Sequence, residues 1–200
     1  CERVENGVRV ELAGEAPVYI VHLSSAAGLE AVREARARGQ GHFGVETCTQ
    51  YLTLTEAAYA DPREGLKYIM SPPLRTQADC GALWGGLADG SIQAVATDHC
   101  PFRFAGEKQR GARDFTACPN GAPGVEERLP VLYSEGVAGG RISLPRLVAL
   151  LCANPSRLYG LYPRKGALLP GSDADVVLLD PGGRRTLTQS PLHSAADYTC

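Results

Sequence analysis

The chain has 200 residues, of which 44% are hydrophobic and 21% charged, and its formal net charge is −2 at pH 7. This length allows one or two domains with a substantial core. The near-neutral charge gives no reason to expect a nucleic acid partner, and no apolar run is long enough to span a membrane. Seven cysteines without a framework spacing and no opening signal peptide favour reduced thiols in a cytoplasmic protein.

The first hundred residues alternate between short apolar runs and amphipathic segments. Strands are predicted over 16–25, 42–52, 66–75 and 91–99. Between them we expect helices over 26–41 and 76–91, and a short helix followed by a turn over 54–65. A regular alternation of strands and helices is typical of a parallel α/β sheet or barrel.

The second half begins with a different kind of segment. Residues 102–124 are rich in glycine and charge and show no period, and a loop of this length in a compact domain is usually functional or mobile. Helices are predicted over 125–137 and 143–161, where Ser143 is a suitable N-cap. A short apolar run then predicts a strand over Asp175–Leu179.

Polar side chains follow three of the predicted strands, at the point where each strand ends. These are His22 after VYIV, Ser71 after KYIM and Asp98 after QAVAT. Ligands of parallel α/β folds bind at the C-terminal ends of strands, and an imidazole and a carboxylate can share one zinc ion. Zinc lowers the pKa of a bound water to about 7, which makes hydroxide available at neutral pH.

Each of these residues also has a purely structural interpretation. His22 alone can be a hydrogen-bonded core histidine, and Asp98 can cap the next helix. On a regular strand His99 points away from Asp98, so we expect it to play a supporting or structural part. The other candidates are expected to be inert thiols or solvated histidines: Cys48, Cys100 and Cys118, and His42 and His193.

The motifs in the chain resemble those of a known family. VYIVHLSS, ETCTQYL, KYIMSPPLR, ATDHCPF, DFTACPNGAPGVEER and KGALLPGSDADVVLLDP occur in the order found in hydantoinases and dihydropyrimidinases, which are cyclic amidohydrolases. The similarity runs from about Ala16 to Tyr198. It implies a partial TIM-like (β/α) barrel over 1–165, made of its C-terminal strands and helices, and the start of a C-terminal β-sandwich over 166–200.

The resemblance also implies an activity: the metal-dependent hydrolysis of a small cyclic amide. The family holds two zinc ions, bridged by a carboxylated lysine and a hydroxide. By motif, His22 resembles a ligand of one metal. Asp98 resembles a ligand of the other metal and the catalytic base. Ser71 and Asn120 resemble the positions whose main chain holds the substrate ring. A homo-oligomer, a tetramer by resemblance, is implied as well.

The chain departs from the family pattern in its metal ligands. It contains no His-x-His pair, and its three lysines, Lys67, Lys108 and Lys165, lie outside the context of the carboxylated lysine. It therefore resembles the C-terminal half of a family member. By itself we expect it to bind zinc weakly or not at all, and to have no measurable cyclic amidase activity. Two alternatives stay open: a non-catalytic dihydropyrimidinase-related structural or interaction protein, and an allantoinase.

Overall fold

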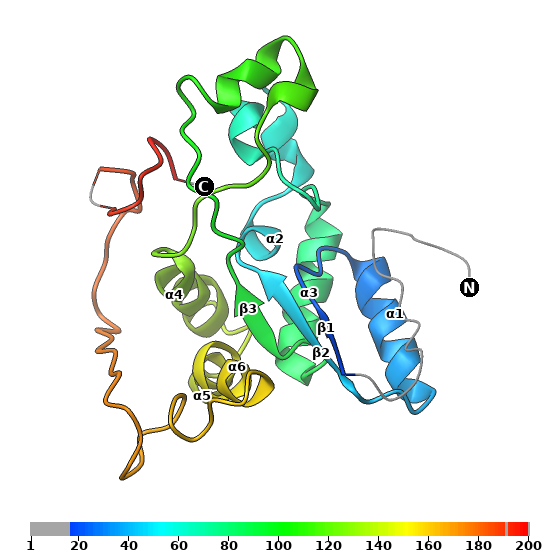
Figure 1. The fold of residues 1–200 in the computed structure, drawn as a ribbon, viewed down its shortest axis with the longest axis vertical. Coiled ribbons are helices and arrows are strands. Elements are labelled where there is room, and N and C mark those ends of the chain that lie inside the picture. The colour runs from blue at the N-terminus through cyan, green and yellow to red at the C-terminus, as the bar shows by residue number, and fades with distance from the viewer. Residues whose placement is uncertain (1–16, 191, 200) are drawn as a thin grey trace.

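The computed structural model describes residues 17–190 and 192–199. Three parallel strands form one sheet in the order β1 (Val18–Ile20), β2 (Phe43–Cys48) and β3 (Ala94–Ala96) (Figure 1). Because all three strands run the same way, their carboxyl ends meet at one edge of the sheet. The predicted α/β class with a parallel sheet is confirmed.

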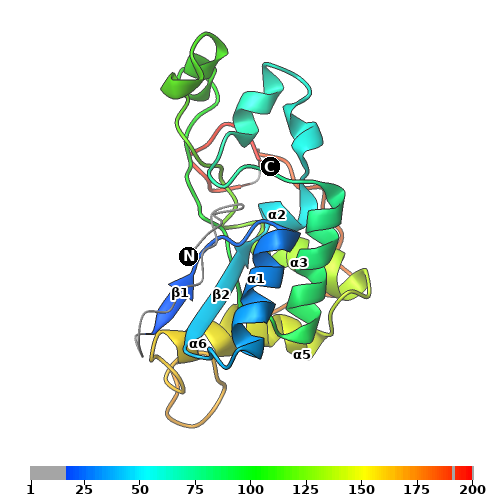
Figure 2. The ribbon, with the colours of Figure 1, turned by 90° about the vertical axis from the view of Figure 1, so that its right-hand side faces the viewer.

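Two long helices cover one face of this sheet. Figure 2 shows α1 (Ala26–Ala37) and α3 (Gln77–Asp89) side by side across β2. Each begins at a side-chain cap: the Ser25 hydroxyl accepts the Gly28 N–H at 3.1 Å, and Thr76 opens a capping box. A cap satisfies N–H groups that the first helical turn leaves unbonded, which fixes where the helix begins.

The remaining helical elements are short. They are α2 (Gln50–Thr53), α4 (Arg128–Val131), α5 (Leu144–Val148) and α6 (Asn154–Leu158), 3-10 turns at Glu56–Tyr59, Glu64–Tyr68, Lys108–Ala112 and Phe115–Ala117, and π-helical turns at Leu132–Ala138 and Ala149–Ala153. The π-helical turns extend α4 and join α5 to α6, so the helices predicted over 125–137 and 143–161 are confirmed. No helix among the described residues is long and apolar enough to cross a membrane.

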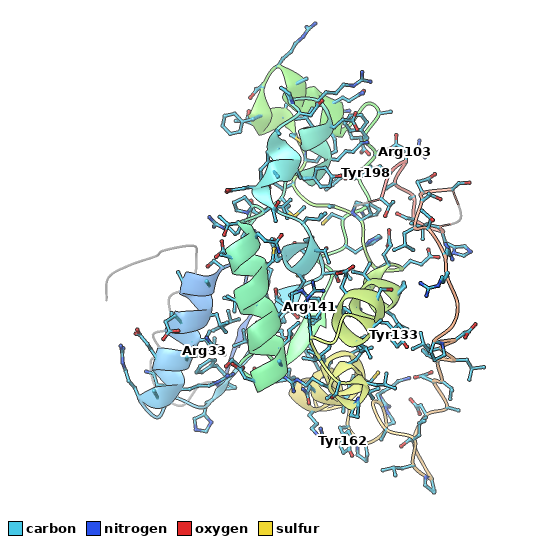
Figure 3. All side chains as sticks on the ribbon, turned by 180° about the vertical axis from the view of Figure 1, so that it is seen from behind. Arg33, Arg103, Tyr133, Arg141, Tyr162 and Tyr198 are labelled. Atoms are coloured by element: carbon cyan, nitrogen blue, oxygen red, sulfur yellow. The ribbon has the colours of Figure 1, made fainter. Side chains whose placement is uncertain are left out.

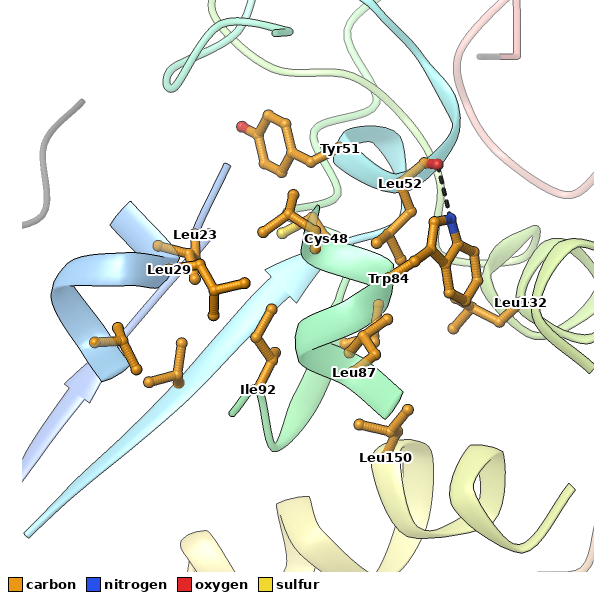
Figure 4. Packing of buried hydrophobic residues seen from close by; sticks show 14 of the residues in the cluster. Leu23, Leu29, Cys48, Tyr51, Leu52, Trp84, Leu87, Ile92, Leu132 and Leu150 are labelled. Carbon is orange, nitrogen blue, oxygen red and sulfur yellow. Dashed lines mark hydrogen bonds between the residues drawn. The ribbon is translucent and has the colours of Figure 1, made fainter. Parts of the chain in front are cut away.

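The core lies between the sheet and the helices. Leu29, Val45, Leu83 and Leu87 are fully buried there, and Trp84 donates its ring N–H to the carbonyl oxygen of Leu52 at 3.0 Å (Figure 4). Complete burial of one such aliphatic side chain contributes about 1.5–3 kcal/mol relative to leaving it exposed. These residues supply much of the stability on which the sheet edge depends.

Side chains from the later helices lie along β3. Three of them donate to main-chain carbonyls in β3 or just before it: Arg128 to Val95 (3.2 Å), Arg146 to Ile92 (2.9 Å) and Asn154 to Gln93 (2.9 Å). These bonds satisfy carbonyl groups that a neighbouring strand would otherwise bond. They also hold α4–α6 against the sheet, beside β3 (Figure 1).

The strand predicted within residues 54–75 is wrong. The short helix and turn predicted over 54–65 are found as the 3-10 helix Glu56–Tyr59 and the turn after it, whereas the strand predicted over 66–75 is a 3-10 turn followed by irregular chain. Leu66, Met70 and Leu74 are still buried. Pro72 and Pro73 have no N–H to donate to a strand ladder, which explains why the run does not join the sheet.

The C-terminal segment also differs from the prediction. No strand forms over Asp175–Leu179 or elsewhere among residues 166–190 and 192–199. The segment runs along the outside of the molecule (orange in Figure 1), where Leu178 is 93% exposed. A strand needs a neighbour for its N–H and C=O groups, and this run has none among the described residues. Residues 1–16, 191 and 200, which the predicted domains include, lie outside the described residues.

The last described residues return to the loop over 102–124. The Asp197 carboxylate accepts the N–H groups of Phe104 (2.6 Å) and Ala105 (3.1 Å), and the Tyr198 hydroxyl donates to the carbonyl oxygen of Lys67 at 3.1 Å. Figure 3 shows Tyr198 next to Arg103 in this loop. The loop is long and largely irregular, as predicted, but it is fastened at this point.

Candidate functional site

His22 and Asp98 lie at the same edge of the sheet. Each follows its strand by two residues, His22 after β1 and Asp98 after β3, and both strands pair with β2 in parallel. The Leu23 N–H donates to the carbonyl oxygen of Glu46 at 2.9 Å, so β1 is held to β2 just past His22. His22 is half-buried and Asp98 is exposed. Both polar groups are therefore available to a ligand at this edge.

The backbone at these two positions is unusual. His22 has φ 42° and Asp98 has φ 50°, and no other non-glycine residue among those described has a positive φ. His and Asp tolerate this left-handed region better than most residues, but it still costs about 1–3 kcal/mol at each position. Such strain occurs preferentially at functional sites. The coincidence marks this edge as the candidate site.

The Cys48 thiol and the Tyr51 phenol near Asp98 are held in their protonated forms. Burial raises the pKa of the Cys48 thiol far above its usual value, and the charges of Glu46 and Asp98 raise it further. Burial likewise raises the pKa of the Tyr51 phenol, whose hydroxyl donates to the carbonyl oxygen of Pro72 at 2.7 Å. A thiol held in its protonated form is a poor nucleophile and a poor metal ligand. This agrees with the prediction that Cys48 is inert.

His99 anchors a loop. Its Nδ1 accepts the N–H groups of Gly124 (3.1 Å) and Val125 (3.3 Å), and its main chain pairs with Ala122 in a parallel bridge. A nitrogen that accepts hydrogen bonds carries no proton, so Nε2 carries it in the neutral ring. His99 thus fastens the loop that carries Asn120 to the end of β3.

Ser71 and Asn120 lie on two loops that meet above this edge. Both side chains are exposed. The Ile69 carbonyl oxygen, two residues before Ser71, accepts the N–H of Gly121 at 3.0 Å. Ser71 was predicted at the end of a strand; it lies instead in irregular chain, because residues 66–75 are not part of the sheet. The loops are nevertheless joined next to both predicted substrate-binding positions.

Sequence reasoning missed two residues of this region. Lys108 is fully buried in the loop over 102–124, and its Nζ donates to the same Ile69 oxygen at 2.7 Å. Gly121 has φ 120°, and a methyl group placed on it would lie 2.4 Å from Cys100 Cβ. The Asn-Gly pair is a turn signal that could have indicated Gly121. Lys108 gives no comparable signal in the sequence.

The residues fit part of a metal site. Neutral imidazole and carboxylate are good zinc ligands, so His22 and Asp98 have the right chemistry. Catalytic zinc usually takes three protein ligands and structural zinc four. In residues 17–190 and 192–199, however, no three His, Cys, Asp or Glu side chains are grouped to hold a metal ion. His42 is exposed, and His193 is exposed and contacts Glu126, as expected of solvated histidines.

A hollow among the described residues lies at the opposite end of the sheet. It has a volume of about 350 Å³ and is lined by residues at the amino ends of the strands, including Val18, Phe43 and Gln93. In barrel folds this end serves stability, whereas chemistry takes place at the carboxyl end. Tyr19 beside it donates its hydroxyl to Glu46 at 2.7 Å and packs edge-on against Tyr159. The hollow is therefore not part of the candidate site.

The chain belongs to the amidohydrolase family, whose pattern matches residues 20–198. It is 52% identical over 189 residues to D-phenylhydantoinase from Escherichia coli O1:K1, a match that covers 94% of this chain and 41% of the relative. The structure of dihydropyrimidinase from Brevibacillus agri NCHU1002 is similar with a TM-score of 0.90 and 44% identity, over 92% of this chain and 40% of that one.

A more distant structure is that of L-hydantoinase (dihydropyrimidinase) from Arthrobacter aurescens. Its TM-score is 0.68 at 36% identity, and the match covers 78% of this chain and 34% of that one. The chain thus spans about two fifths of the length of the E. coli relative (41%).

Proposed function

We propose that this chain contributes part of the active site of a cytoplasmic, zinc-dependent hydrolase that opens the C–N bond of a hydantoin or dihydropyrimidine ring. One observation carries the proposal: His22 and Asp98 share a sheet edge and are the two non-glycine residues with a left-handed backbone in the described part of the chain. The names of the similar proteins support the choice of a cyclic amide as the substrate.

The residues divide the chemistry between them. His22 would hold one zinc ion through a neutral ring nitrogen, and Asp98 would hold the second ion. Zinc, when bound, supplies a water whose pKa is about 7. Asp98 would serve as general base and acid, taking up a proton at its carboxylate and giving it to the ring nitrogen whose C–N bond breaks. The main chain near Ser71 and Asn120 orients the ring. The three lysines of this chain, Lys67, Lys108 and Lys165, lie outside the motif context of the family's carboxylated lysine.

The architecture is part of the same proposal. Residues 1–165 would form the C-terminal strands and helices of a TIM-like barrel, and 166–200 the start of a β-sandwich. Three parallel strands with helices between them and the TM-score of 0.90 support the barrel. The apolar run Val176–Leu179 is exposed, which favours its burial against another part of the whole protein. That part would be either the sandwich strands or other subunits of a homo-oligomer such as a tetramer.

A hybrid protein tests the function. In it, this chain replaces the matching 41% of the E. coli D-phenylhydantoinase. We expect the hybrid to hold two zinc ions and to hydrolyse a hydantoin. A folded, zinc-loaded hybrid without hydrolysis would contradict the proposal. A folded, zinc-free hybrid without hydrolysis would favour the non-catalytic alternative.

The 200-residue chain is the companion sample in this experiment. Two ligands are too few for a closed zinc site, so we expect the chain alone to lose zinc on dialysis and to show no cyclic amidase activity. Metal analysis after dialysis and a hydantoin assay measure both. Stoichiometric zinc that survives dialysis would refute the weak binding.

A further inference from the structure

Lys108 is a charged residue in a position where charge is costly. Its side chain is fully buried, in the 3-10 turn Lys108–Ala112, and its Nζ donates to the carbonyl oxygen of Ile69 at 2.7 Å. An ammonium group that is removed from water needs hydrogen-bond acceptors in defined places, or the fold is strongly destabilised. The protein therefore fixes this amine and its acceptor relative to each other.

The acceptor is shared with a second donor. The Ile69 oxygen also accepts the N–H of Gly121 at 3.0 Å. Ile69 precedes Ser71 by two residues, and Gly121 directly follows Asn120. One carbonyl oxygen thus joins three segments: the turn with Lys108, the loop with Ser71 and the loop with Asn120.

Close packing holds the same three segments together. A methyl group placed on Gly111 would lie 2.6 Å from Cys118 Cβ and 3.0 Å from Leu66 Cδ2, so the turn approaches both other segments as closely as a glycine allows. The Lys108 N–H donates to the carbonyl oxygen of Arg103 at 3.0 Å, which places the lysine within its turn. The loops cannot separate without exposing the packed surface and breaking the bonds to Ile69.

We infer that Lys108 is a positioning residue that sets the spacing between the Ser71 and Asn120 loops. This inference rests on the proposed function, in which those loops hold the ring of a cyclic amide. A ring amide presents N–H and C=O groups at a fixed separation, so the main-chain groups that bind it need an equally fixed separation. If the spacing is lost, the ring and the transition state both bind less tightly, which raises KM and leaves kcat nearly unchanged. In this proposal Lys108 acts on the ring only through the two loops.

Amide hydrogen exchange on the 200-residue chain tests the positioning. Lys108→Met keeps the unbranched shape of the side chain, one atom shorter, but removes its donors. We expect the Gly121 amide and the loop over 119–124 to exchange about tenfold faster in this variant, while α3 changes by less than about twofold. Lys108→Arg, which keeps a donor and a charge, should recover part of the protection. Lys165→Met is the control, because Lys165 pairs with Asp173 and Asp175 on the exposed segment.

Equal exchange at Gly121 in Lys108→Met and the unsubstituted chain would overturn the inference. So would a uniform increase across α3 and the loops, since that pattern means a loss of global stability alone. If Lys108→Met does not fold, lysine acetylation of the unsubstituted chain decides. We expect Lys108 to be modified at least about tenfold more slowly than Lys165. Equal rates would show that the loops open freely around the amine, and would overturn the inference.

Kinetics of the hybrid enzyme separate a positioning role from a structural one. Lys108→Met should raise KM for the hydantoin by about tenfold and leave the zinc content unchanged, and Lys108→Arg should restore part of the affinity. A lower kcat at unchanged KM would contradict this. If the hybrid with native Lys108 is inactive, the proposed function fails, and the exchange experiment still decides whether Lys108 spaces the loops.

Discussion

Asp98 is the proposed general base, and its backbone lies in the left-handed region. Its backbone has φ 50°, a region that Asn also tolerates well, so Asp98→Asn removes the charge without adding backbone strain. In the hybrid enzyme we expect turnover to fall by about 10²–10⁴-fold, the contribution of a positioned general base. Substrate affinity should change less, because the ring is held near Ser71 and Asn120. Steady-state kinetics with metal analysis measures both.

The control for this prediction is the next residue. His99→Asn places an amide oxygen where Nδ1 now accepts the N–H groups of Gly124 and Val125. The loop should stay attached, and the loss of turnover should be much smaller than for Asp98→Asn. If Asp98 serves only as a cap, Asp98→Asn will lower the melting temperature and leave turnover nearly normal, which would end the catalytic assignment.

At Gly121 we expect a single added methyl group to lower the stability of the protein strongly. Alanine there must adopt φ 120° and would meet Cys100 Cβ at 2.4 Å. We expect Gly121→Ala to lower the free energy of unfolding by about 2–4 kcal/mol, from backbone strain and steric overlap together. Gly106→Ala is the matched control, since it has φ 81° but no atom within 4 Å of the added methyl. Urea denaturation compares them, and equal losses would contradict the role of Cys100.

At the level of the helix, α3 contains two adjacent glycines with opposite predicted effects. A methyl group on Gly85 would meet no atom within 4 Å. Alanine has the higher helix propensity, so Gly85→Ala should stabilise the protein by about 0.5–1 kcal/mol. A methyl group on Gly86 would lie 3.0 Å from Leu29 Cδ2 and 3.0 Å from Ile92 Cδ1, where α1 packs against α3. Gly86→Ala should therefore destabilise it by about 1–3 kcal/mol.

Thermal unfolding of the two variants decides between these forecasts, with the unsubstituted chain as reference. A stabilising Gly86→Ala would mean that Leu29 and Ile92 can move aside, and that α1 is less closely packed on α3 than the structure indicates.

The strand ends and helices could be predicted from the sequence because their signals are local. The run VYIV and the spacing in 76–91 each specify one element, and His22 and Asp98 follow from where strands stop. The run over 66–75 misleads because Leu66, Met70 and Leu74 are buried through contacts with other loops, without joining the sheet. The burial of Lys108 depends on Ile69, 39 residues away, so no local pattern could reveal it.

At the level of the whole molecule, the exposed run Val176–Leu179 predicts self-association. Leu178 is 93% exposed and Val177 71%, within an extended segment that has no strand partner among the described residues. Apolar segments of this kind associate with other chains. We expect the 200-residue chain to associate in light scattering, and Leu178→Lys to reduce the association without lowering the melting temperature.

Thr188→Lys is the control for this experiment, because it adds the same charge at an exposed position without removing an apolar side chain. Equal effects of the two substitutions would assign the association to net charge, and a monomeric unsubstituted chain would contradict the prediction outright.

The contact between Asp197 and the loop at Phe104 has a consequence for biosynthesis. The two residues are 93 positions apart. Ribosomes add about 5–20 residues per second, so Asp197 is synthesised about 5–20 s after Phe104. Until then the N–H groups of Phe104 and Ala105 lack this acceptor. The strands β1, β2 and β3 can pair long before that, because each is joined to the next by a local crossover. During translation the loop can therefore attach to Ile69 and His99 while its first turn, at Phe104 and Ala105, still lacks the Asp197 acceptor.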